Sequence, residues 1–505
     1  MAAAQLATWM LEREARAMLA RLDRVKPFVV QETMLPAAAL SPAAQMGIEH
    51  YLLRGRRTLR QQIRRYIRWL QGAGRGAAPA EQQRRFTFLR LQFNMALSQL
   101  DLFSDAITQR SENETGLWLS GLDVAAQDAL DLPGGYFRAP PVVCYLHRGL
   151  GGAIRRARTR LPGGGENPVS IIRIPRERMI GYGIASSLVH ETGHQAAALL
   201  GLIESLRPEI QRARQGTVGP ERVAWRLFER WISEVVADVY SIARVGVAST
   251  MGLIGLVSLP RAFVFRITPD DPHPFAWIRV HLSCAFGDAL YPHPQWRQLA
   301  RVWNSLYPIG RLPADRVRVI RALLATTPAF IGLVLGHRPA ALRGLSLGEI
   351  LRTEDRSPDQ LLRRYASWTK DPTAIRRTRP ALAFAVIGQA RARGLLTPED
   401  EDRLLGRLIS YWALQSTLEA NARFAEVAGG SPPALAVSGA TAVPRGWPLP
   451  PRLARAGPRP RTPARGVPRG MGPRARSPVR GVPRATVPRS RPPVRGVPRG
   501  PRRRA

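Results

Sequence analysis

Residues 190–194 read His-Glu-Thr-Gly-His, and this pentapeptide constrains the fold more than any other feature of the 505-residue chain. Apolar residues recur at helical spacing from Ile184 to Ile203, so the pentapeptide is predicted to lie on an amphipathic helix. Positions i and i+4 share one face of a helix, so His190 and His194 can bind one metal ion while Glu191 reaches its edge. The core is therefore predicted to include a helix that carries two metal ligands and a carboxylate base.

A third ligand is needed, because a catalytic zinc usually takes three protein ligands and leaves a fourth position for water. The metzincin extension HExxHxxGxxH would need Gly at 197 and His at 200, and Ala197 and Leu200 exclude that family. Segment 231–240 instead presents Glu234 and Asp238 at spacing i, i+4. We expect Glu234 to be the third ligand and Asp238 to accept a hydrogen bond from a ligating imidazole. The alternatives are that Glu234 is a solvated residue of a helix that also carries Glu229, or that Asp238 ligates the metal directly instead.

The order of the motifs resembles that of the gluzincin metallopeptidases. In the prenyl-protease and membrane heat-shock-protease types, HExxH is followed by an E(F)EAD segment and then by an HP…RI segment. The matching stretches here are 190–194, 234–238 and 273–280, within a resemblance that covers about residues 165–285. The resemblance implies a zinc-dependent peptidase with these roles: zinc ligands His190, His194 and Glu234, general base Glu191, and transition-state stabiliser His273 or Arg279.

Two of these assignments have ordinary structural alternatives. His273 lies in Asp-Asp-Pro-His-Pro, which by itself predicts a turn that starts a helix. Arg279 fits equally well as a member of the helix that follows. Tyr182 and Tyr240 could donate a hydrogen bond to an oxyanion, but core packing is the favoured interpretation of both.

Hydrophobic spans, which the membrane gluzincins carry around their motifs, are not evident in this chain. The uncharged stretch Val245 to Pro260 has 16 residues and includes three glycines, and the apolar segment Pro328–His337 is shorter still. The start has no basic region of a signal peptide, and the two cysteines show no metal-ligand spacing. We therefore expect a cytoplasmic relative of the group without a transmembrane span.

The remaining segments predict a mostly α protein with a small β element. Segments 141–146 and 170–174 are typical of strands, and a strand just upstream of HExxH can bind an extended peptide along its edge. Leu59–Leu70 and Glu81–Ile107 are predicted to be helices, and Thr397 is predicted to cap another. The expected regions are a helical N-terminal part (1–135), a zincin-like core (136–300), a helical C-terminal part (301–428) and a tail (429–505).

The tail differs from the rest in composition. Residues 427–505 contain 18 Arg and no acidic residue, and Arg-Gly-Val-Pro-Arg recurs with a period of 15. Such a segment cannot bury enough apolar surface to fold, so residues 429–505 are predicted to be disordered. Their charge could attract a polyanion such as nucleic acid or an anionic membrane. Compositional bias is the alternative, since the chain has 75 Lys and Arg residues of which only Lys26 and Lys370 are lysine.

These observations favour a zinc metallopeptidase acting on a peptide or protein substrate. The main alternative is a non-catalytic zincin-like scaffold whose Arg-rich tail binds a partner or polyanion.

Overall fold

The computed structural model describes residues 3–24, 34–149, 151–161, 165–179, 181–268 and 270–427. They belong to one compact unit, Met1–Pro451. The tail expected at 429–505 lies outside the described residues, and the division into four regions stays a prediction.

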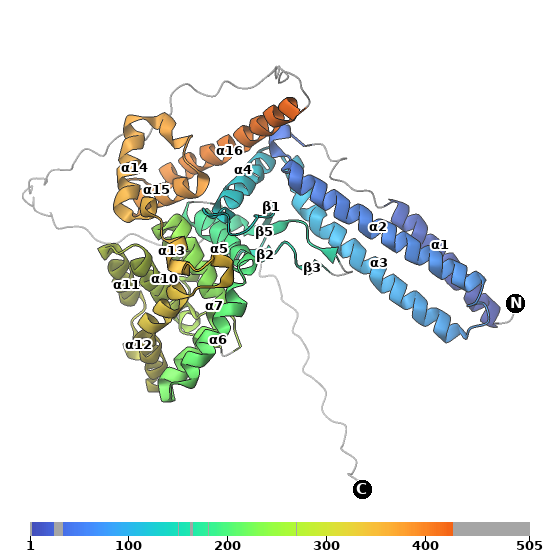
Figure 1. The fold of residues 1–505 in the computed structure, drawn as a ribbon, viewed down its shortest axis with the longest axis horizontal. Helices are drawn as coiled ribbons and strands as arrows, with labels where there is room; N and C mark the ends of the chain where they lie inside the picture. Colours follow the sequence, from blue (N-terminus) through green and yellow to red (C-terminus); the bar gives the residue numbers. More distant parts are fainter. Residues whose placement is uncertain are drawn as a thin grey trace, which may run out of the picture. The chain divides into compact units, whose positions relative to one another are not determined.

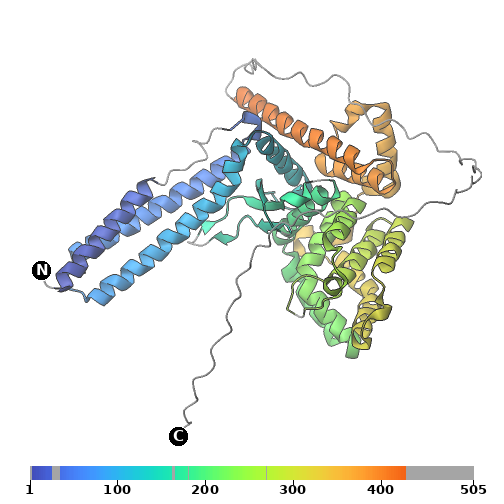
Figure 2. The same ribbon diagram turned by 180° about the vertical axis from the view of Figure 1, so that it is seen from behind.

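The described chain is mostly helical with a small β element, as predicted (Figures 1 and 2). The helices of the first half are α1 (Ala3–Arg24), α2 (Pro42–Gln71), α3 (Pro79–Thr108), α4 (Asn113–Leu130), α5 (Tyr182–Leu199), α6 (Leu202–Gln215) and α7 (Gly219–Val245). Those of the second half are α8 (Val247–Val257), α9 (Arg261–Val264), α10 (Ala276–Leu290), α11 (Pro294–Leu306), α12 (Ala314–Gly336), α13 (Leu347–Leu351), α14 (Pro358–Lys370), α15 (Pro380–Ala392) and α16 (Pro398–Val427). The strands are β1 (Val142–His147), β2 (Ala153–Arg155), β3 (Arg160–Leu161), β4 (Gly165–Glu166) and β5 (Ser170–Pro175).

The main sheet has three strands in the order β1-β5-β2. β5 pairs in parallel with β1 and antiparallel with β2. The two strands expected from the sequence, β1 and β5, are therefore confirmed, but β5 is central and the edge next to the motif helix belongs to β2. β3 and β4 form a separate two-stranded hairpin.

The two faces of the main sheet pack against different helices. Cys144 and Ile172 face the large core that α4, α5 and the later helices build. Val143 and Ile171 face the other way, into a second cluster with residues of α2 and α3 such as Phe103. Both faces are covered, which explains why these strands read as nearly continuous apolar runs.

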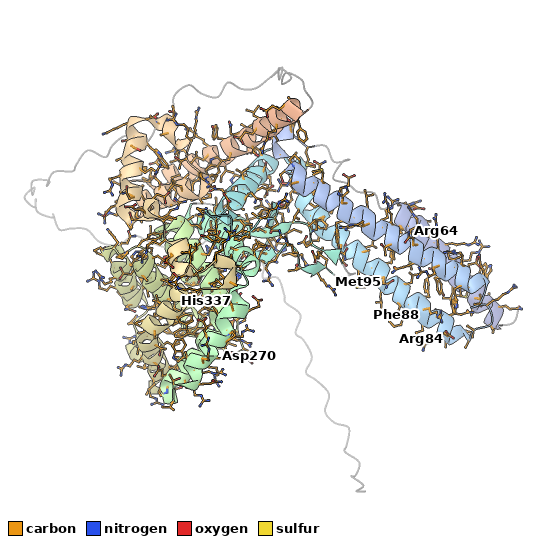
Figure 3. The ribbon with its side chains drawn as sticks, in the orientation of Figure 1. Arg64, Arg84, Phe88, Met95, Asp270 and His337 are labelled. Carbon is orange, nitrogen blue, oxygen red and sulfur yellow. The ribbon has the colours of Figure 1, made fainter. Side chains whose placement is uncertain are left out.

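The N-terminal helices α1, α2 and α3 share a third apolar cluster, which includes the predicted stripe around Ile63 of α2. Their outer faces point to solvent, where Arg64 on α2 and Arg84 on α3 are exposed (Figure 3). One apolar side chain, Phe88 on α3, also keeps 63% of its surface accessible on this side. The helix expected between Glu81 and Ile107 is confirmed by α3.

The motif helix α5 packs closely against α7. A Cβ added to Gly193 would lie 2.9 Å from the Cα and carbonyl oxygen of Ala237, so the two backbones approach more closely than a side chain allows. α5 ends earlier than the apolar pattern predicted, because Gly201 adopts a left-handed conformation (φ 61°) and a new helix, α6, begins at Leu202. The glycine inside HETGH thus serves packing: it brings the helix of His190 and His194 onto the helix of Glu234 and Asp238.

α12 continues through Pro328, so the apolar segment Pro328–His337 is largely the second half of a longer helix. Within the described residues, this helix is the one that is long and apolar enough to cross a membrane by length and composition. One of its faces belongs to the core, where Phe330 stacks on Phe228 of α7 with ring centroids 4.1 Å apart.

Candidate metal centre

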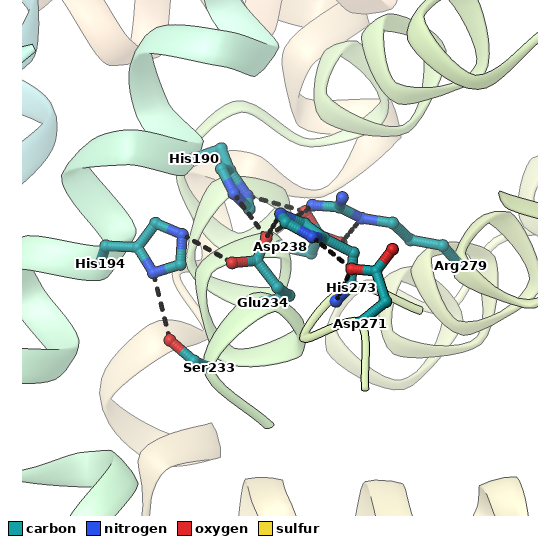
Figure 4. Close-up of polar contacts among 8 residues, drawn as sticks. All are labelled: His190, His194, Ser233, Glu234, Asp238, Asp271, His273 and Arg279. Atoms are coloured by element: carbon teal, nitrogen blue, oxygen red, sulfur yellow. Dashed lines mark hydrogen bonds and ion pairs between the residues drawn. The ribbon is translucent and has the colours of Figure 1, made fainter. Parts of the chain in front are cut away.

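Three side chains from α5 and α7 converge on one point (Figure 4). The Nε2 atoms of His190 and His194 each lie 3.3 Å from one oxygen of the Glu234 carboxylate. One ligand atom from each of the three residues falls within 4.8 Å of the others, so the group could hold a metal ion. The structure therefore brings together the three residues that the sequence singled out as ligands.

The two contacts involve different oxygens of Glu234: His190 Nε2 lies 3.3 Å from Oε2, and His194 Nε2 lies 3.3 Å from Oε1. Contacts of this length leave the two imidazole nitrogens and the carboxylate close enough together to share one metal ion. The side chains are also only 11–16% exposed, so they are held by the surrounding helices before any ion arrives.

Asp238 lies next to the three candidate ligands and contacts His190. Its Oδ1 is 2.8 Å from His190 Nδ1, although the ring is not turned for a straight hydrogen bond. Ser233 is placed similarly behind His194, with its hydroxyl 3.4 Å from Nδ1. In both rings the Nε2 atom is left facing Glu234, as expected when a neighbouring polar group selects the tautomer of a ligating imidazole.

Arg279 holds the two carboxylates of α7 in place. Its Nε and Nη2 lie 2.7 and 2.9 Å from the two oxygens of Asp238, and Nη2 lies 3.4 Å from Glu234. Burial raises the pKa of Asp238, but Arg279 and His190 lower it more, to about 2. Asp238 therefore stays ionised behind the ligands at every physiological pH.

The buried charges at this point favour binding of a cation. Three carboxylates, on Glu191, Glu234 and Asp238, face one guanidinium, on Arg279. Burial lowers the pKa of His190, yet Asp238 and Glu234 raise it more, to about 10, so without a metal ion the imidazole itself carries the compensating proton. A buried carboxylate cluster that attracts positive charge this strongly is compensated when a metal ion binds.

Glu191 reaches the same point from the floor of a cleft. The cleft has a volume of about 550 Å³ and is lined by the ligands, by Gly151–Arg156 except Arg155, and by residues of α5 and α8. Burial raises the pKa of the Glu191 carboxyl, which makes its carboxylate a stronger base. A Cβ added to Gly152 would meet Glu191 Oε1 at 2.6 Å, so this carboxylate lies directly beside the backbone that leads into β2.

His273 and Arg279 occupy different positions around the ligands. The His273 side chain is 53% exposed, lines the cleft, and places Nε2 3.6 Å from Glu234 while Asp271 holds Nδ1 at 2.9 Å. The Arg279 side chain is 10% exposed and directs its guanidinium at Asp238. The structure thus brings both residues to the cleft, His273 with an exposed ring and Arg279 buried against Asp238 and Glu234.

The tyrosines considered above point elsewhere. Tyr240 donates its hydroxyl to the Ala129 carbonyl at 2.6 Å, and Tyr182 donates to the Gly388 carbonyl at 3.4 Å. Both belong to the packing of the core.

Several residues of the cleft were missed by sequence reasoning. They are Gly151, Gly152, Ala153, Ile154 and Arg156 around β2, Ser186 and Ser187 on α5, and Leu253 and Leu256 on α8. The glycine pair before Ile154 was the one signal available, since glycines mark a close approach of backbone to another group.

Comparison of the chain with models of protein families, with curated proteins and with solved structures found no match.

Proposed function

We propose that this protein is a zinc-dependent metallopeptidase of gluzincin type that hydrolyses peptide bonds. One observation carries the proposal: two imidazole nitrogens stand 3.3 Å from the oxygens of one carboxylate, with a buried carboxylate base beside them in an open cleft. The donor set of two His and one Glu is that of catalytic zinc sites, which keep a coordination position for water or substrate.

The zinc ligands would be His190, His194 and Glu234. Zinc in such a site supplies a Lewis acid that polarises the substrate carbonyl and makes water nucleophilic near neutral pH. Asp238 and Ser233 keep the Nε2 atoms of the two imidazoles directed at the ion.

Glu191 acts as the general base. It takes the proton from the water that attacks the peptide carbonyl, and it then gives that proton to the amine that leaves. Its burial favours this role, because a carboxylate with a raised pKa accepts a proton more readily.

The substrate would bind as an added strand along β2. This strand is one edge of the main sheet, and Gly152 directly before it lies so close to Glu191 that an added Cβ would be 2.6 Å from Oε1. An extended peptide that pairs with this edge gains main-chain hydrogen bonds and places a carbonyl beside the base.

His273 is the better candidate for the donor that stabilises the oxyanion, because it lies on the cleft side of Glu234 with an exposed ring. Arg279 is engaged by Asp238 and acts as a positioning residue for the carboxylates.

The test is a comparison of wild type with Glu191→Gln in zinc-loaded form, using a peptide library with mass-spectrometric detection of products. The variant is expected to bind zinc as wild type does and to lose hydrolysis by at least about a hundredfold. Zinc binding without cleavage by the wild type would instead support the scaffold function, and normal turnover in the variant would contradict the assignment of the base.

A further inference from the structure

One cation in the cleft is not engaged by the metal site. Arg156 lines the cleft just after β2 and is exposed. Across the described part of the chain, no hydrogen bond or ion pair of its guanidinium is formed, whereas Arg279 is held by Asp238. Arg156 is therefore available to a ligand in a way that Arg279 is not.

The alternation of β2 separates Arg156 from Arg155. β2 covers only Ala153–Arg155, and its alternation, continued one residue beyond each end, puts Gly152, Ile154 and Arg156 on one face; all three line the cleft. Ile154 pairs with Ile172, which faces the large core, and a Cβ added to Gly152 would lie 2.6 Å from Glu191 Oε1. Arg155 pairs with Ile171 on the opposite face and does not line the cleft, although Arg155 and Arg156 both border a second hollow there.

The distance along the strand sets the place of Arg156 relative to the reacting bond. Arg156 lies four residues further along the chain than Gly152, and at about 3.4 Å per residue of extended chain this is about 14 Å. A peptide that pairs with β2 and places its reacting carbonyl beside Glu191 therefore passes Arg156 about four residues away from that carbonyl.

The cleft also offers apolar surface. Ile154, which lies between Gly152 and Arg156 in the chain, lines it together with Leu253 and Leu256 of α8. A side chain of the peptide that enters this part gains free energy by burying apolar surface. Arginine at the far end favours a carboxylate, which its guanidinium can bind through two parallel hydrogen bonds.

We infer that Arg156 is a specificity-determining residue that selects extended peptides with an apolar side chain near the scissile bond and a carboxylate about four residues away. The inference rests on the proposed peptidase function for its biological meaning, but the binding preference is measurable without turnover. The carboxylate can come from an Asp or Glu side chain or from the C-terminus of the peptide.

The experiment measures binding of fluorescein-labelled peptides to the zinc-loaded Glu191→Gln protein by anisotropy. The peptides carry a central Leu and either Glu or Gln at each position from two to five residues on both sides, with amidated and free C-termini as separate arms. We expect one position of Glu, or the free C-terminus, to bind about five- to tenfold more tightly than its uncharged counterpart.

A matched pair of variants decides whether Arg156 causes the preference. Adding Arg156→Gln to the Glu191→Gln protein should abolish the preference, whereas adding Arg155→Gln should keep it, because Arg155 is equally close in sequence and faces away. Equal binding of Glu and Gln peptides, or an unchanged preference in the Arg156→Gln protein, would overturn the inference. Failure of the wild type to cleave the preferred peptides would overturn the peptidase proposal while leaving the binding result in place.

Discussion

Asp238→Asn is the most informative perturbation of the candidate metal centre, because it keeps the shape of the side chain and removes its charge. Asp238 contacts His190 at 2.8 Å and Arg279 at 2.7 and 2.9 Å. Loss of a group that orients a ligating histidine typically weakens metal binding by about 10- to 100-fold, or about 1.4–2.7 kcal/mol. The variant should therefore bind zinc more weakly by this amount.

The same substitution should also destabilise the fold without zinc. Burial raises the pKa of Asp238, but Arg279 and His190 bring it from 3.8 down to about 2, a shift worth about 2 kcal/mol. Removing one partner of a buried ion pair costs about 3–5 kcal/mol, and the lower end applies because Arg279 keeps Glu234 at 3.4 Å. We expect a loss of about 2–3 kcal/mol in the free energy of unfolding.

Zinc affinity is measured by competition with a chromophoric chelator, and the free energy of unfolding by urea titration in excess chelator. Asp271→Asn is the control, since Asp271 holds His273 on the exposed side of the site and should leave both quantities within experimental error. Wild-type zinc affinity in the Asp238→Asn protein would refute the view that Asp238 orients the ligand.

Three further substitutions test the surrounding structure. Gly193→Ala, whose methyl would lie 2.9 Å from the backbone of Ala237, should lower the free energy of unfolding by about 1–3 kcal/mol and weaken zinc binding, measured by urea and zinc titrations; unchanged values would show that the helices can separate freely. Gly152→Ala places a methyl 2.6 Å from Glu191 Oε1, so kcat/KM on a cleaved peptide should fall by about a hundredfold while zinc content stays the same; wild-type kinetics would exclude this position for the base. Burial raises the pKa of Glu401 from 4.5 in the unfolded chain to about 7 in the folded protein. The folded protein therefore disfavours the charged carboxylate, and Glu401 lowers the free energy of unfolding as the pH rises above 4.5. Glu401→Gln should therefore be more stable than wild type by about 3 kcal/mol near pH 8, with the difference gone near pH 4 in urea titrations, and a pH-independent difference would contradict the sign of the shift.

The three metal-ligand candidates were predictable because their spacing is local. His190 and His194 lie one helical turn apart, and so do Glu234 and Asp238, so each pair is fixed by helix geometry alone. The contact between α5 and α7 is a tertiary contact, and it is closest where Gly193 approaches the backbone of Ala237. The motif includes this glycine, but its spacing does not indicate that Ala237 is the partner.

The edge of the sheet could not be predicted. β2 has three residues, Ala153–Arg155, which is too short for an alternating pattern to be recognised. The longer apolar run at β5 was expected to offer the edge, yet strands covered on both sides are the ones that read as continuous apolar runs. The central strand was thus found from its sequence, and the edge strand was visible only in the structure.

The roles of His273 and Arg279 could be distinguished only from the structure. Motif order placed both near the ligands, but whether a side chain lies on the cleft side or behind the carboxylates depends on how α10 packs against α7. The contacts of Arg279 with Asp238 distinguish its role from that of His273, and spacing along the chain could not have done so.

The central claim is that His190, His194 and Glu234 hold a zinc ion that is used for hydrolysis. The most direct measurement is zinc stoichiometry by mass spectrometry, with peptide cleavage measured on the same samples, for wild type, His190→Ala, Glu234→Ala and Glu191→Gln. We predict bound zinc and cleavage in wild type, loss of both in the two ligand variants, and bound zinc without cleavage in Glu191→Gln. Full zinc content in the His190→Ala and Glu234→Ala proteins, or cleavage by Glu191→Gln at the wild-type rate, would contradict the account.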